Sequence, residues 1–539
     1  MADDITADVI IVGSGISGAI MAARLAASGV KVAILEAGKS VDRQDAVETY
    51  WNALIKVPEC PYPPVPEAMH PISNDLDFWY DQTGPDKFAS TYIKVVGGTT
   101  WHWLGTCLRL VPNDFRLKTL YGQGVDWPIA YDDLERFYGE AESEIGVAGD
   151  SASDLGSPRS TPYPMPEIPQ TYLDKAYFKA LEGTIYDVRS TPQGRNSETR
   201  EDRPPCCGNA SCIPICPIQA KYDGTVHVAR AVSAGATLHE ATTAVFVEVG
   251  ADRKVSAIRF KRWDGSEGRA TGKVYVLAAH AIEIPRLLLN STSEATPNGA
   301  ANSSDQVGRN LMDHPTQLSW ARAKDALYPY RGPLSTSGIE NLRDGDFRKE
   351  RGAFRIEIGN DGWSWPTGAP ITTAQELATQ GLRGAALDDA LNFQTARHIR
   401  LASLVEQPPD PENRVTLDTE SLDIYGVGRP KIAYRLDDYT KAGFKASVEA
   451  HDAIFQKLGA TEVKHSPVAQ GAGHIIGTAR MGADGKTAVV DADLRSHDHP
   501  NLFVLGSAVF PTSATANPTL TIAAMAIRAV DAVKATLAG

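Results

Sequence analysis

Apolar runs and a helical pattern alternate at the start of the chain. Residues 7–12, ADVIIV, centre on a β-branched apolar run, which is typical of a strand buried on both faces of a parallel sheet. The alanine-rich segment 19–29 predicts a helix that ends at Gly29, and VKVAILE at 30–36 predicts a second strand. This order predicts a strand–helix–strand unit of an α/β fold.

The same pattern returns further along the chain. Residues 236–278 alternate short strands with polar turns and end on VYVLAA, which precedes a helix predicted from Ile282. From Val489 onward the sequence again predicts strand, turn and helix. Between these segments, 318–405 predicts loops and strands, and 438–458 predicts an amphipathic helix. We therefore predict two domains whose segments are interleaved along the sequence.

Two other segments have distinctive polar patterns. Residues 57–66, VPECPYPPVP, contain too much proline for a helix or central strand and predict an extended loop. Residues 126–146 show helical apolar spacing behind a capping Asp126. They predict an exposed amphipathic helix whose acidic residues form a solvated face.

A glycine motif lies between the first strand and the first helix. Gly13-Ser14-Gly15-Ile16-Ser17-Gly18 has the G-x-G-x-x-G spacing, and Glu36 closes the second strand eighteen residues beyond Gly18. In this context the backbone amides at the helix start would bind a pyrophosphate, and the carboxylate would bind a ribose hydroxyl. The alternative is a glycine turn in another α/β unit. The position of the glycine motif near the N-terminus favours a permanently held FAD over NAD, by analogy with other flavoproteins.

A second glycine pair occurs in GGTTWHW. Gly97 and Gly98 would allow the backbone to approach a flat ligand closely, and Thr99 and Thr100 offer hydroxyl groups to its polar edge. His102 stands between two tryptophans. It is either a catalytic candidate or part of an aromatic layer under a cofactor.

Composition and charge narrow the classes of function. The 539 residues are 42% hydrophobic and 22% charged, as in an ordinary globular protein with room for two or three domains. The net charge of -13 and the lack of a basic run argue against a nucleic-acid partner. No apolar stretch approaches eighteen residues, and the acidic start is unlike a signal peptide. The compartment stays open between cytosol and a periplasm reached with a partner.

Four of the six cysteines fall in CCGNASCIPICP, residues 206–217. The spacing, with Pro217 directly after Cys216, is similar to runs that hold iron–sulfur clusters. Structural zinc is one alternative, but no second cysteine pair or paired histidine follows. A disulfide framework is another, although it would add little to a chain with a large core. The iron–sulfur interpretation is favoured.

Several ordered motifs resemble the glucose-methanol-choline (GMC) flavin oxidoreductases. They are GGTTWHW, the AAHAIEIPRLLL segment, VGRNLMDHP at 307–315, HIIGTARMG at 474–482 and GSAVFPTSATANPTLTIAAMAIRA at 506–529. The resemblance implies a Rossmann-like FAD-binding domain interleaved with a substrate domain built on an antiparallel sheet. The FAD-binding domain is expected at 1–45, 90–150, 206–316 and 489–539. The substrate domain is expected at 46–89, 151–205 and 317–488.

The cysteine loop is similar to that of one branch of the family, the large subunits of membrane-bound bacterial sugar and polyol dehydrogenases. This branch carries FAD and a [3Fe-4S] cluster. The resemblance implies a small subunit with the export signal and a multihaem cytochrome c that accepts electrons and anchors the complex. The protein would then lie at the periplasmic side of the inner membrane.

The resemblance also gives roles to individual residues. His474 and Asn517 match the catalytic pair of the family. A neutral imidazole suits removal of an O–H proton near pH 7, and an amide can donate to the substrate oxygen. The helix after Asn517 would point its N-terminus at the flavin pyrimidine edge. His314, His497 and His499 are expected to be structural.

The expected cofactor contacts come from five parts of the sequence. They are Gly13, Gly15, Ser17, Gly18, Glu36, Gly97, Gly98, Thr99, Thr100, His102, Trp103, Val245, Ala278, Ser507, Ala508, Asn517, Pro518 and Thr519.

A [3Fe-4S] cluster needs three thiolates, and adjacent side chains on an extended backbone point to opposite sides. The expected ligands are Cys206, Cys212 and Cys216, with Cys207 facing outward; the set with Cys207 in place of Cys206 is the alternative.

The sequence therefore favours an FAD-dependent dehydrogenase that oxidises a sugar or polyol by hydride transfer to flavin N5. An aldose such as glucose, oxidised at C1, is the expected substrate, with fructose, sorbitol or gluconate as alternatives. Electrons would pass through the cluster to a cytochrome c. The competing functions are an oxygen-using oxidase, a non-catalytic electron-transfer flavoprotein and a flavoprotein with a structural zinc.

Overall fold

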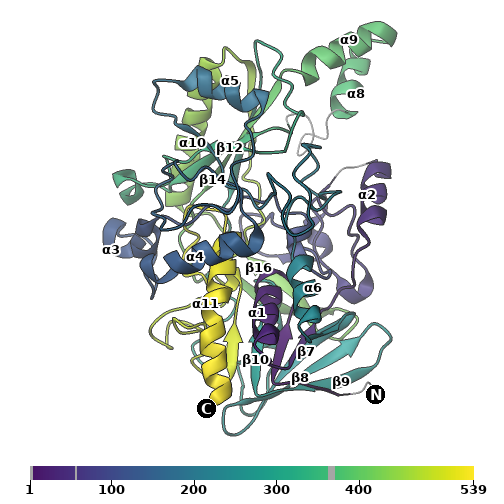
Figure 1. The fold of residues 1–539 in the computed structure, drawn as a ribbon, viewed down its shortest axis with the longest axis vertical. Coiled ribbons are helices and arrows are strands. Elements are labelled where there is room, and N and C mark those ends of the chain that lie inside the picture. Colours follow the sequence, from purple (N-terminus) through teal and green to yellow (C-terminus); the bar gives the residue numbers. More distant parts are fainter. Residues whose placement is uncertain (1–3, 55–56, 362–370) are drawn as a thin grey trace.

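The computed structural model describes residues 4–54, 57–361 and 371–539. Figure 1 shows two parts, one around β10, α1 and the long helix α11, the other around β12, β14 and α10. Both chain termini lie in the first part. We call the first part the nucleotide half and the second the substrate half.

A parallel sheet of five strands forms the centre of the nucleotide half, in the spatial order β18, β10, β2, β3 and β6. All four pairings are parallel. Every residue of β2, β3, β10 and β18 is buried, which explains the uninterrupted apolar sequences of these strands. The strands are β2 (Val9–Val12), β3 (Val32–Leu35), β6 (Thr237–His239), β10 (Val274–Leu277) and β18 (Leu502–Val504).

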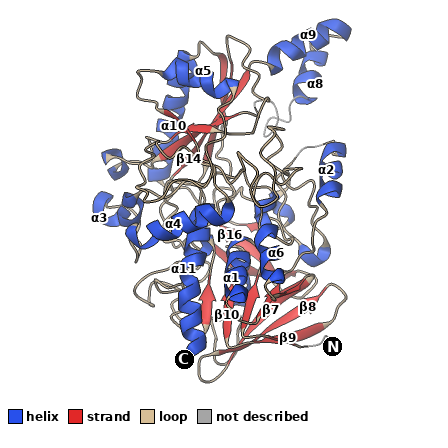
Figure 2. Cartoon of the chain, in the orientation of Figure 1, coloured by secondary structure: helices blue, strands red, loops and turns tan. Residues whose placement is uncertain are grey.

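Helices cover this sheet. Helix α1 (Ile16–Ala27) packs against α6 (Thr225–Ser233) and α11 (Thr519–Ala538), as Figure 2 shows. Helix α11 also packs against α4 (Asp132–Ile145). The sheet and its helices draw on segments from both ends of the chain, as interleaved domains require.

A smaller antiparallel sheet extends the nucleotide half. Strands β7 (Thr242–Val249), β8 (Val255–Arg262) and β9 (Glu267–Thr271) form a meander, and β1 (Ile5–Thr6) adds in parallel to β9. These strands correspond to the alternating pattern predicted for 236–278. The prediction is confirmed.

A six-stranded antiparallel sheet forms the substrate half, in the order β17, β11, β14, β13, β12, β5. Helix α10 (Asp438–Lys457) packs against β11, β14 and β17, and Asp437 caps it by accepting from Thr440 N. This confirms the predicted antiparallel sheet and amphipathic helix. The strands are β5 (Val188–Ser190), β11 (Thr316–Arg322), β12 (Ser337–Ile339), β13 (Phe354–Gly359), β14 (His398–Val405) and β17 (Thr461–His465).

The other elements of the described residues are a small sheet, several helices and short 3-10 turns. One further sheet joins β15 (Arg414–Leu422), β16 (Gly428–Ala433) and β4 (Asp81–Gln82). The remaining helices are α2 (Arg43–Asn52), α3 (Leu117–Tyr121), α5 (Tyr172–Leu181), α7 (Glu283–Asn290), α8 (Ile371–Thr379) and α9 (Gly384–Thr395). The short 3-10 helices are η1 (Pro66–Ala68), η2 (Leu76–Phe78), η3 (Gly98–Trp101), η4 (Pro112–Arg116), η5 (Asp346–Lys349) and η6 (Ser507–Val509).

The structure corrects two predictions. The helix predicted from Asp126 begins only at Asp132, and Asp126 accepts from Thr119 N instead of capping it. Its acidic face is not all solvated, because Glu142 is fully buried against Arg109 at 2.8 Å. The region 318–405 contains helices α8 and α9 besides the predicted loops and strands. Part of that region, 362–370, lies outside the described residues.

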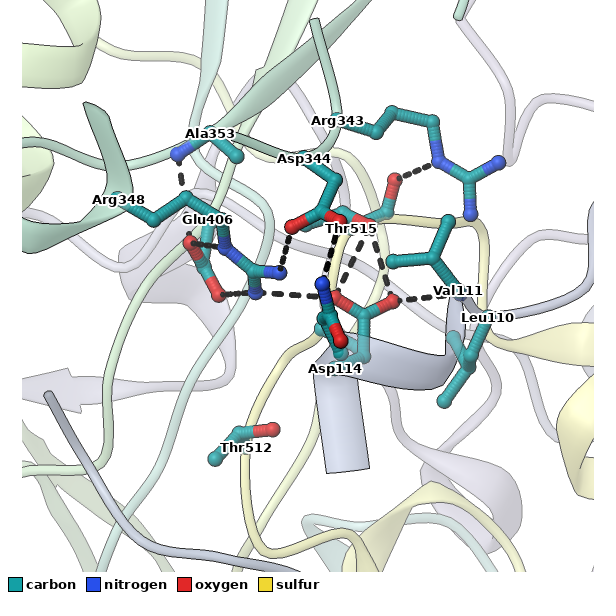
Figure 3. A network of polar contacts seen from close by, with 12 residues as sticks. Leu110, Val111, Asp114, Arg343, Asp344, Arg348, Ala353, Glu406, Thr512 and Thr515 are labelled. Carbon is teal, nitrogen blue, oxygen red and sulfur yellow. Dashed lines mark hydrogen bonds and ion pairs between the residues drawn. The ribbon is translucent and has the colours of Figure 1, made fainter. Parts of the chain in front are cut away.

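A buried polar network joins the two halves (Figure 3). Arg348 of the substrate half donates to Asp114 Oδ1 at 2.9 Å and to Glu406 Oε1 at 2.5 Å. Asp114 also accepts from the hydroxyl of Thr515, just before α11, at 2.9 Å. The side chains of Arg348, Asp114 and Glu406 have no exposed surface, so each charge depends on the others for compensation.

Across the described parts of the chain, we found no helix of the length and apolarity that membrane crossing requires.

Candidate active site

A cavity of about 470 Å³ lies between the two halves. Its nucleotide side is formed by the residues that directly follow β2, β3, β10 and β18. Because parallel strands end at one edge of a sheet, these loops converge there. Of the expected cofactor contacts, the cavity is lined by Gly13, Gly15, Ser17, Glu36, Gly98, Thr99, Thr100, His102, Trp103, Val245, Ala278, Ser507, Asn517, Pro518 and Thr519.

The three expected contacts that do not line the cavity are Gly18, Gly97 and Ala508. A side chain on Gly18 would meet Gly13 O at 2.1 Å, so this glycine allows α1 to pack against the strand–helix turn. Gly97 has φ +91° and its N–H donates to Ser14 Oγ at 3.1 Å. Ala508 is fully buried behind the cavity wall.

Ser14 links the glycine motif to Glu36. Its N–H and hydroxyl both donate to Glu36 Oε2, at 2.9 and 2.6 Å, while Gly38 N donates to Oε1 at 2.9 Å. Burial raises the pKa of Glu36, and these donors oppose the shift. The sequence interpretation left Ser14 out, although it stands inside the motif.

The residues of this side fit a dinucleotide such as FAD. The start of α1, at Gly15, has no side-chain cap, so its amides are available for a phosphate. His102 is buried, its Nε2 has no hydrogen-bond partner, and burial lowers its pKa to about 3. A buried polar atom at a cavity wall is expected to meet a ligand or water. The Thr100 hydroxyl is expected from the sequence to contact the ligand. It instead donates to Gly97 O and accepts from Gly224 N.

His474 and Asn517 meet at the same cavity. Asn517 Nδ2 lies 3.2 Å from His474 Nε2, and Asn517 precedes α11, whose first residues line the cavity. The backbone N–H of His474 donates to Asp313 Oδ1 at 3.0 Å. Burial lowers the pKa of His474 well below its usual range, so the ring is neutral at pH 7.

His314, which is expected from the sequence to be structural, lies directly beside this pair. Its Nδ1 lies 3.0 Å from His474 Nδ1, and its Nε2 lies 3.1 Å from Ala514 O. His497 and His499 fit a structural role, because they bond Gly482 O and Arg253 O.

Charged residues of the six-stranded sheet line the other side of the cavity. They are Glu357, Asp361 and Arg400, none of which the sequence singled out. Arg400 and Asp361 form an ion pair at 2.8 Å. Behind them, the buried Arg355 donates to Glu357 Oε2 at 3.2 Å and to Asn517 Oδ1 at 3.3 Å. Two carboxylates and one guanidinium therefore face the space beside the His474–Asn517 pair.

The cysteine loop lies against the same cavity, since Ile213 lines it. Cys212 and Cys216 are buried, Cys206 is partly buried and Cys207 is exposed. Burial raises the pKa of Cys206, the charge of Arg195 opposes this shift, and the neighbouring Cys212 and Cys216 add to it. Within the described residues, no group of three or more His, Cys, Asp or Glu side chains could hold a metal ion as arranged.

One buried guanidinium and one backbone N–H donate to thiols of this loop. Arg195 Nη1 donates to Cys212 Sγ at 3.2 Å, and its Nε has no partner. The backbone N–H of Lys221 donates to Cys216 Sγ at 3.5 Å, and its Nζ donates to the carbonyls of Trp101 and Trp103. A guanidinium and a backbone N–H that donate to sulfur suit thiolates, so these residues fit an anionic sulfur centre.

The fold and this site define an oxidoreductase of the GMC family, to which the chain belongs. The GMC oxidoreductase N-terminal domain matches residues 7–316, and the C-terminal domain matches residues 409–526. Members of this family bind FAD and act on CH–OH groups. The expected Rossmann-like FAD-binding part and antiparallel substrate part are confirmed.

Particular relatives refine the comparison. The chain is 36% identical to the fructose dehydrogenase large subunit of Gluconobacter japonicus over 98% of both chains. It is 23% identical to the gluconate 2-dehydrogenase flavoprotein of Pantoea cypripedii, over 98% of this chain and 93% of that one. Its fold matches pyridoxine 4-oxidase from Mesorbium loti with a TM-score of 0.65 at 18% identity, over 98% of this chain and 99% of that one.

Proposed function

We propose that this protein is an FAD-dependent dehydrogenase that oxidises a CH–OH group of a sugar or polyol. The observation that carries the proposal is the His474–Asn517 pair, which lies at the wall of the cavity formed by the nucleotide-binding loops. Bound FAD would supply a hydride acceptor, its N5. His474 Nε2 would take the hydroxyl proton, and Asn517 would donate to the same oxygen.

The charged side of the cavity supports a neutral polyhydroxy substrate. Carboxylates such as Glu357 and Asp361 accept hydrogen bonds from hydroxyl groups, and Arg400 donates them. Arg400 and Arg355 already pair with Asp361 and Glu357, so a substrate carboxylate would have to compete with these carboxylates for the same guanidinium groups in a buried place, which is unfavourable. We therefore expect glucose or fructose to be oxidised faster than gluconate. An aldose at C1 remains the expected substrate, and the fructose dehydrogenase relative supports fructose as the alternative.

We also propose a [3Fe-4S] cluster held by Cys206, Cys212 and Cys216. The burial of Cys212 and Cys216, the partial burial of Cys206 and the Arg195–Cys212 contact support it. Such a cluster would carry single electrons from the flavin site to an outside acceptor. A relative that is named as a large subunit supports the presence of a smaller partner subunit. On the family resemblance we also propose a cytochrome c acceptor and a place at the periplasmic face of the inner membrane.

The test is a substrate panel with the purified protein. Glucose, fructose, sorbitol and gluconate would each be assayed with an artificial electron acceptor and, separately, with oxygen. We expect turnover of a neutral sugar with the artificial acceptor and little with oxygen. Equal rates with oxygen would identify an oxidase. No turnover of any CH–OH substrate by flavin-loaded protein would favour an electron-transfer flavoprotein.

His474→Ala should lower kcat by about 10²- to 10⁴-fold while the flavin stays bound, because a positioned base contributes that factor. His497→Ala is the matched control, since His497 bonds Gly482 O outside the cavity. Flavin content would be read from visible absorbance. Near wild-type turnover in His474→Ala would contradict the assigned role.

A further inference from the structure

A continuous row of hydrogen bonds passes through the proposed base. It runs from Ala514 O to His314, then to His474, Asn517 and Arg355, with heavy-atom distances of 3.1, 3.0, 3.2 and 3.3 Å. Each of the two histidines and the amide has a donor atom and an acceptor atom when neutral. The two end groups therefore decide which atom donates and which accepts in every hydrogen bond of the row.

The first end is a carbonyl oxygen, which can only accept. His314 Nε2 must therefore carry the hydrogen that points at Ala514 O. His314 is 1% exposed, and burial lowers its pKa to about 4, so it holds only this one proton at neutral pH. Its Nδ1 is then a lone-pair acceptor. The facing Nδ1 of His474 must be the donor.

The second end is a guanidinium, which can only donate. Arg355 is fully buried and is held by Glu340, whose carboxylate accepts from Arg355 Nη2 at 2.8 Å and from Nε at 3.1 Å. The oxygen of the Asn517 amide therefore faces Arg355 Nη1, and the amide N–H₂ faces His474. An N–H₂ group can only donate, so His474 Nε2 must be the acceptor.

The two ends agree although they are independent. Both require His474 to carry its proton on Nδ1 and to keep Nε2 unprotonated. The opposite tautomer would set Nε2–H against the amide N–H₂ and leave the two facing Nδ1 atoms without a proton between them. Asp313 fixes the spacing of the rings, because its Oδ1 accepts from the backbone N–H of both His314 and His474, at 2.7 and 3.0 Å.

We propose that His314 and Arg355 are positioning residues that set the tautomer of His474, so that Nε2 is the free base at the cavity. His314 does this through Nδ1, and Arg355 does it through the orientation of Asn517. A substrate hydroxyl would replace the amide as the donor to Nε2, and the amide would donate to the substrate oxygen. Only the role of His474 as the base rests on the proposed function.

The tautomer can be measured without any substrate. In protein labelled with ¹⁵N-histidine, protonated and unprotonated ring nitrogens have well-separated chemical shifts, and His474→Gln identifies the signals of His474. We expect Nδ1 protonated and Nε2 unprotonated at pH 7. A protonated Nε2 in the wild type would overturn the proposal, whatever reaction the protein catalyses.

A pair of variants tests the role of His314. His314→Leu removes the acceptor, whereas His314→Asn keeps an acceptor oxygen near the position of Nδ1. We expect the leucine variant to lose about 10²-fold in kcat with KM nearly unchanged, because a base in the wrong tautomer costs rate and leaves binding intact. The asparagine variant should recover part of this loss. Its ¹⁵N spectrum should show the wild-type tautomer, and the leucine spectrum should not.

A control separates this effect from the loss of a buried histidine. His451 is also fully buried and joins two hydroxyls, those of Ser319 and Ser403, outside the cavity. His451→Leu should leave kcat and the ¹⁵N signals of His474 unchanged. Equal loss of kcat in His451→Leu and His314→Leu, or equal kcat in the two His314 variants, would overturn the proposal.

Discussion

At the scale of single residues, Glu36 shows how one carboxylate serves two purposes. Its oxygens accept from Ser14 and Gly38, so it ties the glycine motif to the end of β3. It also lines the cavity, where a ribose hydroxyl would approach it. The position of Glu36 at the end of the strand could be predicted from its spacing to Gly18 along the sequence. The contact with Ser14 could not, because it depends on the turn that follows β2.

Glu36→Ala should reduce bound FAD, because it removes both the ribose acceptor and the anchor of the phosphate-binding turn. Flavin content per protein, from absorbance after purification, measures the effect. Glu240→Ala is a close control, since Glu240 accepts the same pair of bonds from Ser40, at 2.9 and 2.6 Å, outside the cavity. Full flavin content in a folded Glu36→Ala protein would remove the assignment.

At the scale of elements, the four cysteines of the loop at 206–217 differ in their burial. The backbone N–H of Cys206 donates to Asn196 O, and Arg43 donates to the carbonyl of Cys216. The thiols of Cys212 and Cys216 are buried and that of Cys206 is partly buried, while Cys207 is exposed. The spacing alone left Cys206 and Cys207 as alternatives. Their different burial favours Cys206.

Single Cys→Ser variants test this assignment through iron content and the electron paramagnetic resonance signal of the oxidised protein. Cys206→Ser, Cys212→Ser and Cys216→Ser should each lose iron and signal, because a [3Fe-4S] cluster has no spare protein ligand. Cys207→Ser is the internal control and should keep both. Loss with Cys207 but not Cys206 would reverse the assignment, and zinc without iron in the wild type would reject the cluster.

At the scale of the whole molecule, the Arg348 network of Figure 3 connects the two halves. Its members come from η4, η5, the end of β14 and the loop before α11. One guanidinium offsets two fully buried carboxylates, Asp114 and Glu406. The cavity is formed by both halves, so we expect this network to hold the proposed base in position relative to the nucleotide loops.

Arg348→Met should destabilise the protein by about 3–5 kcal/mol, because it leaves buried carboxylates without compensation. Lys349→Met is the control: its ion pair with Asp346 is exposed, and such pairs contribute about 0–1 kcal/mol. Chemical denaturation followed by tryptophan fluorescence compares the two. Equal stability of both variants would show that the network does not hold the halves together.

The sequence by itself determined the local elements and the chemistry that depends on neighbours in the chain. Apolar runs specify β2, β3 and β10, and glycines specify the turn before α1, because these features need only adjacent residues. The family resemblance already paired Asn517 with His474, and only the tertiary structure added His314 and Arg355 to them. His314 and Asn517 are separated from His474 by 160 and 43 residues, and Arg355 is separated from Asn517 by 162. Hydrogen-bond direction among such residues depends on packing that joins both halves, and no spacing rule along the chain describes it.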